Sequence, residues 1–275
     1  MKQEVTFEKQ SIGLQGVANA RELGGYIMAD GRRIKRGRLL RSGTLHTATD
    51  ADVALLESKY HLAHIFDYRT EYEKTHEPDR PVAGADNLFL SCLDPRDDEK
   101  QAPTFRLIFG ERFPESLLEF AFTEEAQKLA SVMYSGMVMS EWTQLQYATF
   151  LNYVLNTEEG AVLCHCSQGK DRTGMGIAYL LFALGADRDL VVADFDMSNI
   201  FYHDFIEELF QKIEERGGGE SEKLVIRSFI GVNTPMFEKA LDLVDREFGS
   251  MHDYIVNQLC VSEQELELLR SRYLE

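Results

Sequence analysis

The chain has 275 residues, 44% of them hydrophobic, and a formal net charge of −17 at pH 7. This length allows one large or two small domains with a substantial core. The negative charge argues against nucleic-acid binding and against a polybasic membrane anchor.

Neither a membrane span nor a signal segment is indicated by the apolar residues. No run approaches the roughly 20 apolar residues that a membrane span needs, and the first residues (Met-Lys-Gln-Glu-Val-Thr-Phe-Glu) lack the apolar core of a secretory signal. The four cysteines have no zinc or disulfide spacing, which is typical of a reducing compartment. We therefore expect a cytoplasmic protein, or a secreted one if a signal has been removed or export is non-classical.

Predicted strands and helices alternate from about residue 49 onward. Thr49 and Asp50 can cap a helix that runs to about Tyr60. Short apolar runs predict strands over residues 62–66, 87–93 and 161–164. Apolar residues at helical spacing predict helices over residues 141–155, 173–184, 190–197, 199–216, 235–248, 251–258 and 262–273. This order predicts an α/β fold in a single domain of residues 1–275, with a central, mostly parallel sheet, flanking helices and a helical C-terminal half.

One long segment, around residues 94–141, interrupts this alternation. It begins with charged residues over 94–100 and then turns amphipathic, with apolar side chains from Phe105 to Phe120. Long connections inside a compact domain are often lids or binding loops. A peripheral helix pair packed permanently on the core fits the pattern equally well, so both alternatives stay open at this point.

The most informative stretch joins the last predicted strand to the helix that follows it. It reads V-L-C-H-C-S-Q-G-K-D-R-T-G from Val162 to Gly174, with an arginine six positions after the second cysteine. Because the stretch lies between a strand and a helix, successive backbone N–H groups and the helix N-terminus can converge on one anion. This arrangement suits a thiolate that attacks a phosphate ester.

Cys166 is the expected nucleophile of this loop. The phosphate oxygens are expected to lie among the backbone N–H groups of Ser167, Gln168, Gly169, Lys170, Asp171 and Arg172. The Arg172 guanidinium would hold two of these oxygens in a bidentate fork. A free thiol has a pKa of about 8.5, and such surroundings lower it by several units. The predicted chemistry is phosphoryl transfer to Cys166 and hydrolysis of the phosphocysteine, with no metal or other cofactor.

Several separated segments resemble the bacterial tyrosine-protein phosphatase family, whose members include atypical dual-specificity and lipid phosphatases. Residues 165–174 fit the family's H-C-x-x-G-K-D-R-T-G loop at every fixed position, and residues 66–73 resemble its D-L-R-x-x-x-E block. The other matching blocks are residues 19–25, 36–42 with Leu45, 192–195 with Ser198 and Asn199, and 248–250 with Tyr254. The resemblance covers about residues 12–272 and implies a cysteine-phosphatase-like fold.

The resemblance also bears on two features of the chain. Members of the family shield their active sites with mobile helices, which implies a helical lid or cover from segment 94–141. A lysine at the position of Lys170 accompanies activity on phosphoinositides as well as phosphotyrosine, which implies a second cation for additional phosphates. The alternative for Lys170 is that its charge only offsets neighbouring carboxylates, including Asp171.

The general acid that protonates the leaving oxygen has three candidates. Asp171 lies inside the loop, within reach of a bound ester. Asp94 follows a strand end in a long connection, as the acid does in the broader class of cysteine phosphatases. Asp67 also ends a strand, but its neighbours Arg69 and Glu71 favour a structural ion network. Both Asp171 and Asp94 therefore stay candidates for the acid.

Residues next to the loop are expected to support it. His165 is expected to bond backbone groups and fix the shape of the loop rather than to act as a base. Thr173 is expected to donate its hydroxyl to the Cys166 sulfur, which eases departure of the thiolate in the second step.

Two arginines of the N-terminal blocks, Arg21 and Arg41, are expected to be structural. They are predicted to anchor carboxylates such as Asp67 or Glu71, and neither they nor Ser42 is assigned a catalytic role.

The sequence thus predicts a cysteine-dependent phosphatase that acts on phosphotyrosine first, with phosphoinositides and phosphoserine or phosphothreonine as further substrates. Its partner would be a phosphoprotein or phosphoinositide substrate. Alternatives are an enzyme that is primarily a phosphoinositide phosphatase, a phosphate-binding module without turnover, and a sulfurtransferase. A pure binding module needs no nucleophile, so the presence of Cys166 together with Arg172 and Thr173 argues against that alternative. The arginine favours phosphate transfer over sulfur transfer.

Overall fold

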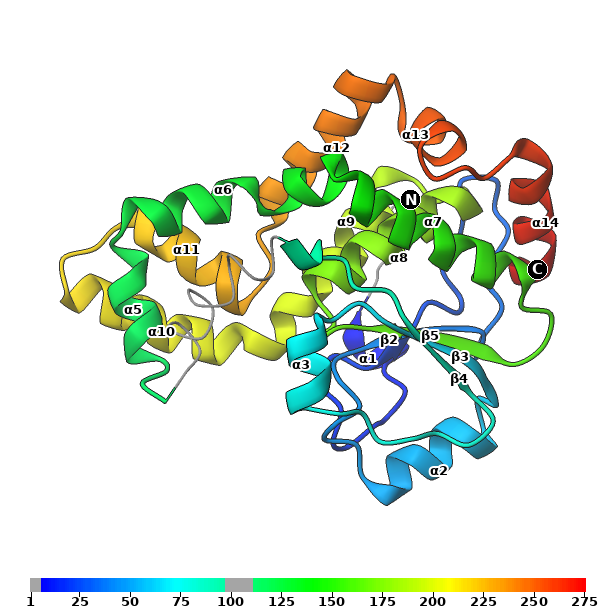
Figure 1. Cartoon of the computed structure of the whole chain (residues 1–275), viewed down its shortest axis with the longest axis horizontal. Helices are drawn as coiled ribbons and strands as arrows, with labels where there is room; N and C mark the ends of the chain where they lie inside the picture. Colours follow the sequence, from blue (N-terminus) through cyan, green and yellow to red (C-terminus); the bar gives the residue numbers. More distant parts are fainter. Residues whose placement is uncertain (1–5, 97–110) are drawn as a thin grey trace.

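The computed structural model describes residues 6–96 and 111–275, in which five strands form one sheet (Figure 1). The strands are β1 (Arg21–Glu22), β2 (Leu39–Ser42), β3 (Leu62–Asp67), β4 (Asp86–Phe89) and β5 (Ala161–His165). Their order across the sheet is β1-β2-β5-β3-β4. The pairs β2–β5, β5–β3 and β3–β4 are parallel, and β1 pairs antiparallel with β2. The predicted α/β fold with a mostly parallel sheet is confirmed.

Helices surround this sheet and fill most of the C-terminal half. The helices that precede the loop are α1 (Phe7–Gln10), α2 (Asp50–Ser58), α3 (Glu71–His76), α5 (Glu115–Ala121), α6 (Glu124–Met139) and α7 (Glu141–Asn156). Those that follow it are α8 (Asp171–Leu184), α9 (Arg188–Asp196), the 3-10 helix η1 (Met197–Tyr202), α10 (His203–Glu215), α11 (Glu220–Ile230), α12 (Thr234–Phe248), α13 (Met251–Asn257) and α14 (Glu263–Tyr273). Most predicted elements are confirmed to within two residues.

Three predictions about elements were incomplete or wrong. The strand predicted over 87–93 ends at Phe89, and the helix predicted over 199–216 is split into η1 and α10. Helices α3 and α11 were not predicted at all. Both begin with an acidic side chain that bonds back to the backbone N–H of the capping residue, Glu73 to Thr70 and Glu222 to Gly219. This bond stabilises a helix start that a pattern of apolar residues does not reveal.

The position of β5 in the sheet determines where the loop lies. All five residues of β5 are buried, as expected for a central parallel strand that is covered on both faces. His165, its last residue, is opposite Ser42 of β2 on one side and Asp67 of β3 on the other. The loop after β5 therefore begins between the carboxyl ends of two neighbouring strands, where α/β sheets commonly bind ligands.

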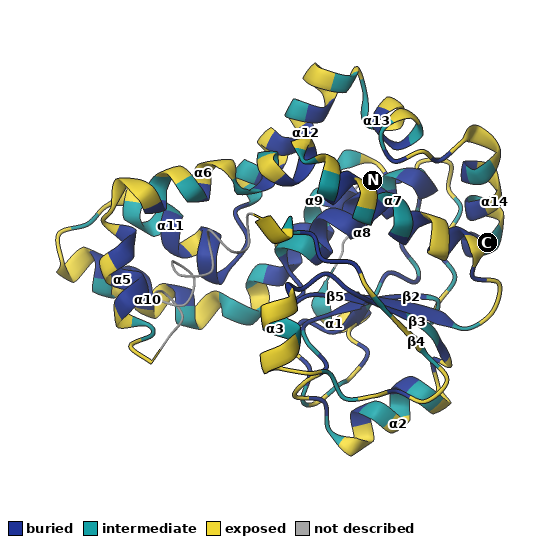
Figure 2. Cartoon of the chain, viewed as in Figure 1, coloured by how far each residue is buried: buried dark blue, intermediate teal, exposed yellow. Residues whose placement is uncertain are grey.

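Among the described residues, the buried hydrophobic side chains form three clusters. Figure 2 shows which parts of the chain are buried. The main core joins one face of the sheet to α7, α8, α9, α12, α13 and α14, and a smaller core lies under α2. The third cluster is formed by side chains of α5, α6, α10 and α11, which extend away from the sheet as what we call the helical lobe (Figure 1). Helix α6 contributes to two of these clusters: Ala126 and Ala130 lie in the lobe, and Tyr134 and Val138 lie in the main core.

The predicted cover segment contributes two of these helices. Residues 97–110 of that segment lie outside the described residues, whereas α5 and α6 pack against α10 and α11 in the lobe. Whether these helices move as a lid, and whether residues 1–275 form one domain, stay predictions. Over residues 6–96 and 111–275, no helix combines the length and the apolar composition needed to cross a membrane.

Candidate active site

The loop between β5 and α8 is held from outside through its carbonyl groups. Asn19 Nδ2 and Arg41 Nη2 both donate to the Gly169 carbonyl at 2.8 Å, and the Thr44 N–H donates to the Ser167 carbonyl at 3.1 Å. In a planar trans peptide the N–H points opposite to the carbonyl. The N–H groups that follow these two carbonyls therefore point away from their supports, toward the inner side of the loop.

Gly169 occupies a position that excludes any side chain. Its φ is +66°, a left-handed value that glycine adopts at little cost, and a Cβ atom there would lie 2.2 Å from the Ser42 carbonyl oxygen. This close approach of the loop to the end of β2 explains why the motif needs glycine three positions after the cysteine.

Cys166 differs from the other buried cysteines in its acidity. Burial by itself would raise the pKa of its thiol, but the charge of the Arg172 guanidinium and the neighbouring polar groups of Thr173 outweigh burial, so the pKa lies below its usual value. Burial raises the pKa of Cys92 and of Cys164 to about 12. The loop therefore favours a thiolate at Cys166 and not at its buried neighbours.

Arg172 is oriented by a carboxylate that had no assigned role. Its Nη1 and Nη2 donate to the two carboxylate oxygens of Glu73 at 2.6 and 2.8 Å. Glu73 also accepts from the Ser167 hydroxyl and, at 2.8 Å, from the Thr70 N–H. Although burial opposes ionisation, the charge of Arg172 and these donors hold the pKa of Glu73 well below its usual range. Glu73 was part of a quoted block, but only the fold shows that it meets Arg172.

Asp171 is the first residue of α8 and contacts α6. The Tyr134 hydroxyl donates to Asp171 Oδ1 at 2.7 Å and accepts from the Asn233 N–H at 3.2 Å. Lys170 Nζ lies 3.4 Å from Asp171 Oδ2. The carboxyl group of this candidate acid is thus held between a tyrosine of α6 and the preceding lysine.

The Lys170 side chain is buried and extends to the end of α11. Its ammonium donates to the carbonyl oxygens of Phe229 and Gly231 at 2.8 and 2.6 Å. Burial lowers its pKa, and the charge of Asp171 opposes that effect. A cation at the C-terminus of a helix is favourable because the last carbonyl groups have no helical partners. Lys170 therefore links the loop to the helical lobe. It also lies near the carboxylate of Asp171, as expected if its charge offsets neighbouring carboxylates.

Asp94 is bound by a neighbour along the chain. Arg96 donates to its carboxylate from the backbone N–H and from Nε, both at 2.9 Å. Asp94 lies five residues after Phe89, the last residue of β4. Asp94 thus has the loop position that was predicted, with Arg96 as its ion-pair partner.

The prediction for Arg21 and Arg41 was wrong in the identity of the carboxylate. Both arginines are fully buried, and both pair with Asp194 of α9 rather than with Asp67 or Glu71. Tyr26 adds a hydrogen bond to Asp194 at 2.9 Å. Since Asp194 is distant in sequence from both arginines, spacing could not indicate this pairing.

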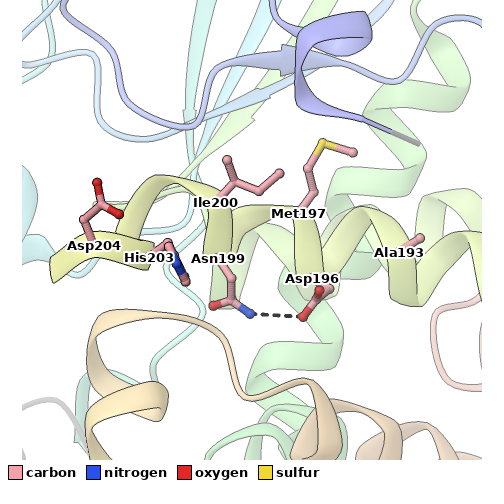
Figure 3. Close-up of a pocket in the computed structure, with 7 residues that line it drawn as sticks. All are labelled: Ala193, Asp196, Met197, Asn199, Ile200, His203 and Asp204. Carbon is pink, nitrogen blue, oxygen red and sulfur yellow. Dashed lines mark hydrogen bonds between the residues drawn. The ribbon is translucent and has the colours of Figure 1, made fainter. Parts of the chain in front are cut away.

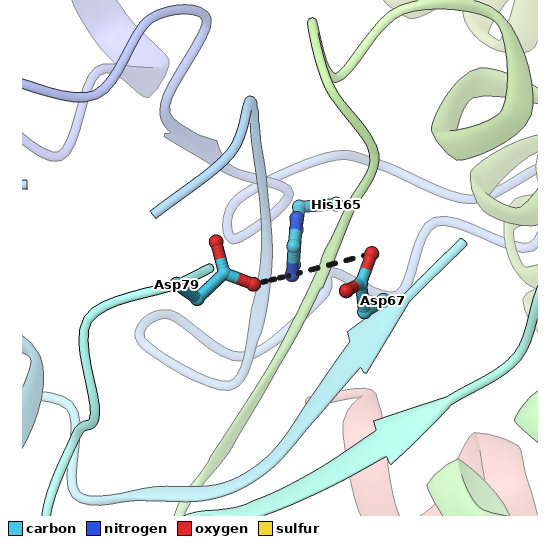
Figure 4. A group of neighbouring side chains, drawn as sticks. All are labelled: Asp67, Asp79 and His165. Atoms are coloured by element: carbon cyan, nitrogen blue, oxygen red, sulfur yellow. Dashed lines mark ion pairs between the residues drawn. The ribbon is translucent and has the colours of Figure 1, made fainter. Parts of the chain in front are cut away.

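Asp67 does belong to an ion network, as predicted, although Glu71 is not its partner there. Arg69 donates to Asp67 from Nε at 2.9 Å and from Nη2 at 2.8 Å, and Nη2 also reaches Asp79 at 2.6 Å. His165 Nε2 lies 3.2 Å from Asp79 and 4.0 Å from Asp67 (Figure 4). Asp67, Asp79 and His165 have the ligand types of a metal site, but the Arg69 guanidinium already supplies a cation to both carboxylates.

A pocket of about 560 Å³ lies along η1 and the ends of its neighbouring helices (Figure 3). It is lined by Ala193, Asp196, Met197, Asn199, Ile200, His203 and Asp204. Among these lining residues, Asn199 donates to its neighbour Asp196 at 3.0 Å. No residue of the loop is among these lining residues in the described part of the chain, so the pocket does not contain the nucleophile.

Comparisons with known proteins identify the family to which the chain belongs. A family model described as the tyrosine phosphatase family matches residues 12–275. A Cupriavidus necator protein provisionally named a tyrosine-protein phosphatase is 25% identical over 267 residues, which cover 97% of this chain and 89% of that protein. The triple specificity protein phosphatase PtpB of Mycobacterium tuberculosis is 26% identical over 237 residues, which cover 81% of this chain and 86% of PtpB. Since the family model spans nearly the whole chain, the protein belongs to the tyrosine phosphatase family.

Proposed function

We propose that the protein is a cysteine-dependent phosphatase that hydrolyses phosphotyrosine through a phosphocysteine intermediate. The observation that carries the proposal is the geometry of the loop around Cys166: its carbonyl groups are bonded on the outside, and Glu73 orients Arg172. The charge of Arg172 also holds the pKa of the Cys166 thiol below its usual value. A nucleophile with this environment is needed for phosphoryl transfer and is unnecessary for phosphate binding alone.

In the first step the Cys166 thiolate attacks phosphorus, and the bond from phosphorus to the ester oxygen breaks. Inward N–H groups of the loop, the N-terminus of α8 and the Arg172 guanidinium stabilise the charge on the three other oxygens. A proton from Asp171 or Asp94 goes to the leaving oxygen. The products are the free alcohol or phenol and a phosphocysteine.

In the second step water attacks phosphorus, and the bond from sulfur to phosphorus breaks. A hydrogen bond donated by the Thr173 hydroxyl to sulfur in this step would stabilise the departing thiolate. The carboxylate left by the first step accepts the proton of the attacking water. Inorganic phosphate leaves, and Cys166 returns to the thiolate state, so the steps balance without metal or redox chemistry.

The proposed substrate range follows from the family and from the names of its relatives. Phosphotyrosine agrees with the family and with the name of the Cupriavidus relative, and PtpB has triple specificity in its name. Phosphoinositides and phosphoserine or phosphothreonine are therefore further candidate substrates. The Lys170 ammonium donates to the carbonyl oxygens of Phe229 and Gly231. It could bind a second phosphate of a phosphoinositide only after leaving these two oxygens.

The experiment compares wild type, Cys166→Ser and Cys260→Ser on a phosphotyrosine peptide and a short-chain phosphoinositide, with chelator present. Cys260 is exposed, so its substitution is the matched control for loss of a thiol elsewhere. The proposal expects turnover that survives chelation and in Cys260→Ser and is lost in Cys166→Ser, with substrate binding retained. Full activity of Cys166→Ser would exclude the covalent mechanism. Absence of turnover by wild type would favour a binding module or sulfur transfer.

A further inference from the structure

The Gly169 carbonyl, on the outer side of the loop, is held by two side chains from the N-terminal part of the chain. Asn19 Nδ2 and Arg41 Nη2 each donate to it at 2.8 Å. The peptide unit that carries this carbonyl also carries the Lys170 N–H, which points the opposite way, toward the inner side of the loop. The two outer bonds therefore set the direction of one N–H group that can donate to a phosphate.

Both of these donors are themselves oriented by other side chains. Arg41 uses Nη1 for a hydrogen bond to Asp194 Oδ2, and Nη2 of the same planar group then faces Gly169. Asn19 could turn either its oxygen or its nitrogen toward the loop, but Arg21 Nη1 donates to Asn19 Oδ1, and a guanidinium can only donate. The amide nitrogen of Asn19 must therefore face the Gly169 carbonyl.

Both arginines are in turn held by Asp194 of α9. Its Oδ1 accepts from Arg21 Nε at 3.1 Å, its main-chain carbonyl accepts from Arg21 Nη2 at 2.8 Å, and its Oδ2 accepts from Arg41 Nη1. All three side chains are fully buried. Although burial opposes ionisation, the charges of the two arginines keep the pKa of Asp194 below its usual value. Two chains of hydrogen bonds thus lead from one carboxylate to one carbonyl of the loop.

We propose that Asp194 is a positioning residue that directs the Lys170 N–H toward bound phosphate by orienting both donors to the Gly169 carbonyl. The proposal deepens the function proposed above and rests on it for its relevance to turnover. The hydrogen bonds to the Asp194 carboxylate come from residues outside the loop. Asp194 therefore acts on phosphate through Arg21 and Arg41, without touching the reacting atoms.

The sign of the effect separates this role from a simple effect of charge. Loss of the negative charge of Asp194 makes the surroundings of the loop more positive, and Coulomb attraction alone would then strengthen the binding of an anion. Loss of positioning would instead let the Gly169 peptide turn, and binding would weaken because the phosphate loses one N–H donor. A hydrogen bond to a charged group changes affinity about 10- to 100-fold.

Inorganic phosphate is the probe for the test. It is titrated into protein labelled with ¹⁵N at lysine and followed by NMR at the Lys170 amide signal, which is identified by its absence in Lys170→Arg. In wild type this signal should shift and saturate. In Asp194→Asn the dissociation constant should rise about 10- to 100-fold, and the shift at saturation should be smaller. Unchanged or tighter binding in a folded Asp194→Asn, or a wild-type signal that does not respond to phosphate, would overturn the proposal.

Arg41→Lys provides a second variant in case Asp194→Asn does not fold. It keeps the positive charge next to the carboxylate, but lysine has a single nitrogen and cannot reproduce the two directions in which the guanidinium bonds Asp194 and Gly169. It should therefore weaken phosphate binding in the same direction. Wild-type affinity in a folded Arg41→Lys would refute the chain of contacts from Asp194 to the loop.

Tyr26→Phe is the matched control. It removes the 2.9 Å hydrogen bond to the same carboxylate and leaves both arginines in place, so the phosphate affinity should stay close to that of wild type even where stability falls. A loss of affinity in Tyr26→Phe as large as in Asp194→Asn would assign the effect to general destabilisation. None of these measurements needs turnover, so an inactive wild type would refute the proposed phosphatase while the dissociation constants still decide the role of Asp194.

Discussion

Glu73 provides the sharpest test of how the site is organised, because one neutral substitution tests both its contribution to stability and its placement of the Arg172 guanidinium. Glu73→Gln keeps the length of the side chain but removes the charge that pairs with Arg172 at 2.6 and 2.8 Å. It also replaces one acceptor oxygen by a donor, which faces another donor at either position. The variant should therefore lose stability and misplace the guanidinium.

The size of the stability effect follows from the exposure of the pair. The Arg172 and Glu73 side chains are 15% and 29% exposed. Disruption of a fully buried ion pair costs about 3–5 kcal/mol, a surface pair contributes about 0.2–1 kcal/mol, and this pair lies between the two cases. We expect a loss of about 2–3 kcal/mol in the free energy of unfolding at pH 7, measured by urea denaturation. Since the pKa of Glu73 is lowered, its contribution is complete above about pH 4.5 and is lost only as pH falls further.

The effect on catalysis follows from the misplaced guanidinium. A shift of about 1 Å in such a group can reduce kcat/KM about 100-fold, so we expect a loss of that order on a phosphotyrosine peptide. Glu71→Gln is the matched control on the same helix, since Glu71 is 69% exposed and only approaches Lys74 at 3.8 Å. It should change stability by no more than about 0.5 kcal/mol. Wild-type stability and turnover in Glu73→Gln would show that the contact with Arg172 is incidental.

Three further predictions concern the loop. One of the two variants Asp171→Asn and Asp94→Asn should remove the general acid and slow hydrolysis of phenyl phosphate about 10²- to 10⁴-fold. The same variant should spare p-nitrophenyl phosphate, because its leaving group needs little protonation. Equal losses on both substrates would argue that the substituted residue is not the acid. Lys170→Ala should cost about 1–3 kcal/mol in urea denaturation because the last carbonyls of α11 lose a charged donor. It should reduce phosphoinositide turnover more than aryl phosphate turnover if Lys170 also binds extra phosphates, and equal losses would assign it to structure. Thr173→Ala should slow hydrolysis of the phosphocysteine more than its formation, so that rapid-quench kinetics show a burst of released phenol; a steady state without a burst would contradict this role.

The loop and the sheet could be predicted from the sequence because their determinants are local. The apolar run of β5, the glycine at 169 and the helix after it are contiguous, and each follows from short-range geometry. The parallel sheet followed from the alternation of strands and helices. This is why both the fold class and the position of Cys166 at the end of a central strand were correct.

The supporting contacts could not be predicted because they join distant parts of the chain. Arg172 and Glu73 are 99 residues apart, and Arg41 and Asp194 are 153 apart. The sequence supplied each charged residue but no information on which opposite charge it meets. Helix α11 was missed for a related reason: it follows three glycines and carries charged residues in its first turn, and its apolar side chains are explained only by the lobe that they complete.

The net charge of −17 raises the question of how an anionic substrate is held at all. Most cations around the loop already face a carboxylate: Arg21 and Arg41 pair with Asp194, Lys170 lies near Asp171, and Arg172 pairs with Glu73. These pairings leave little unpaired positive charge at the loop for a phosphate dianion. The charge of the substrate must then be stabilised mainly by the inward N–H groups and the N-terminus of α8, which carry no net charge. The outer bonds from Asn19 and Arg41 to the Gly169 carbonyl fix the direction of the N–H group that follows it, so we expect loss of either bond to weaken phosphate binding.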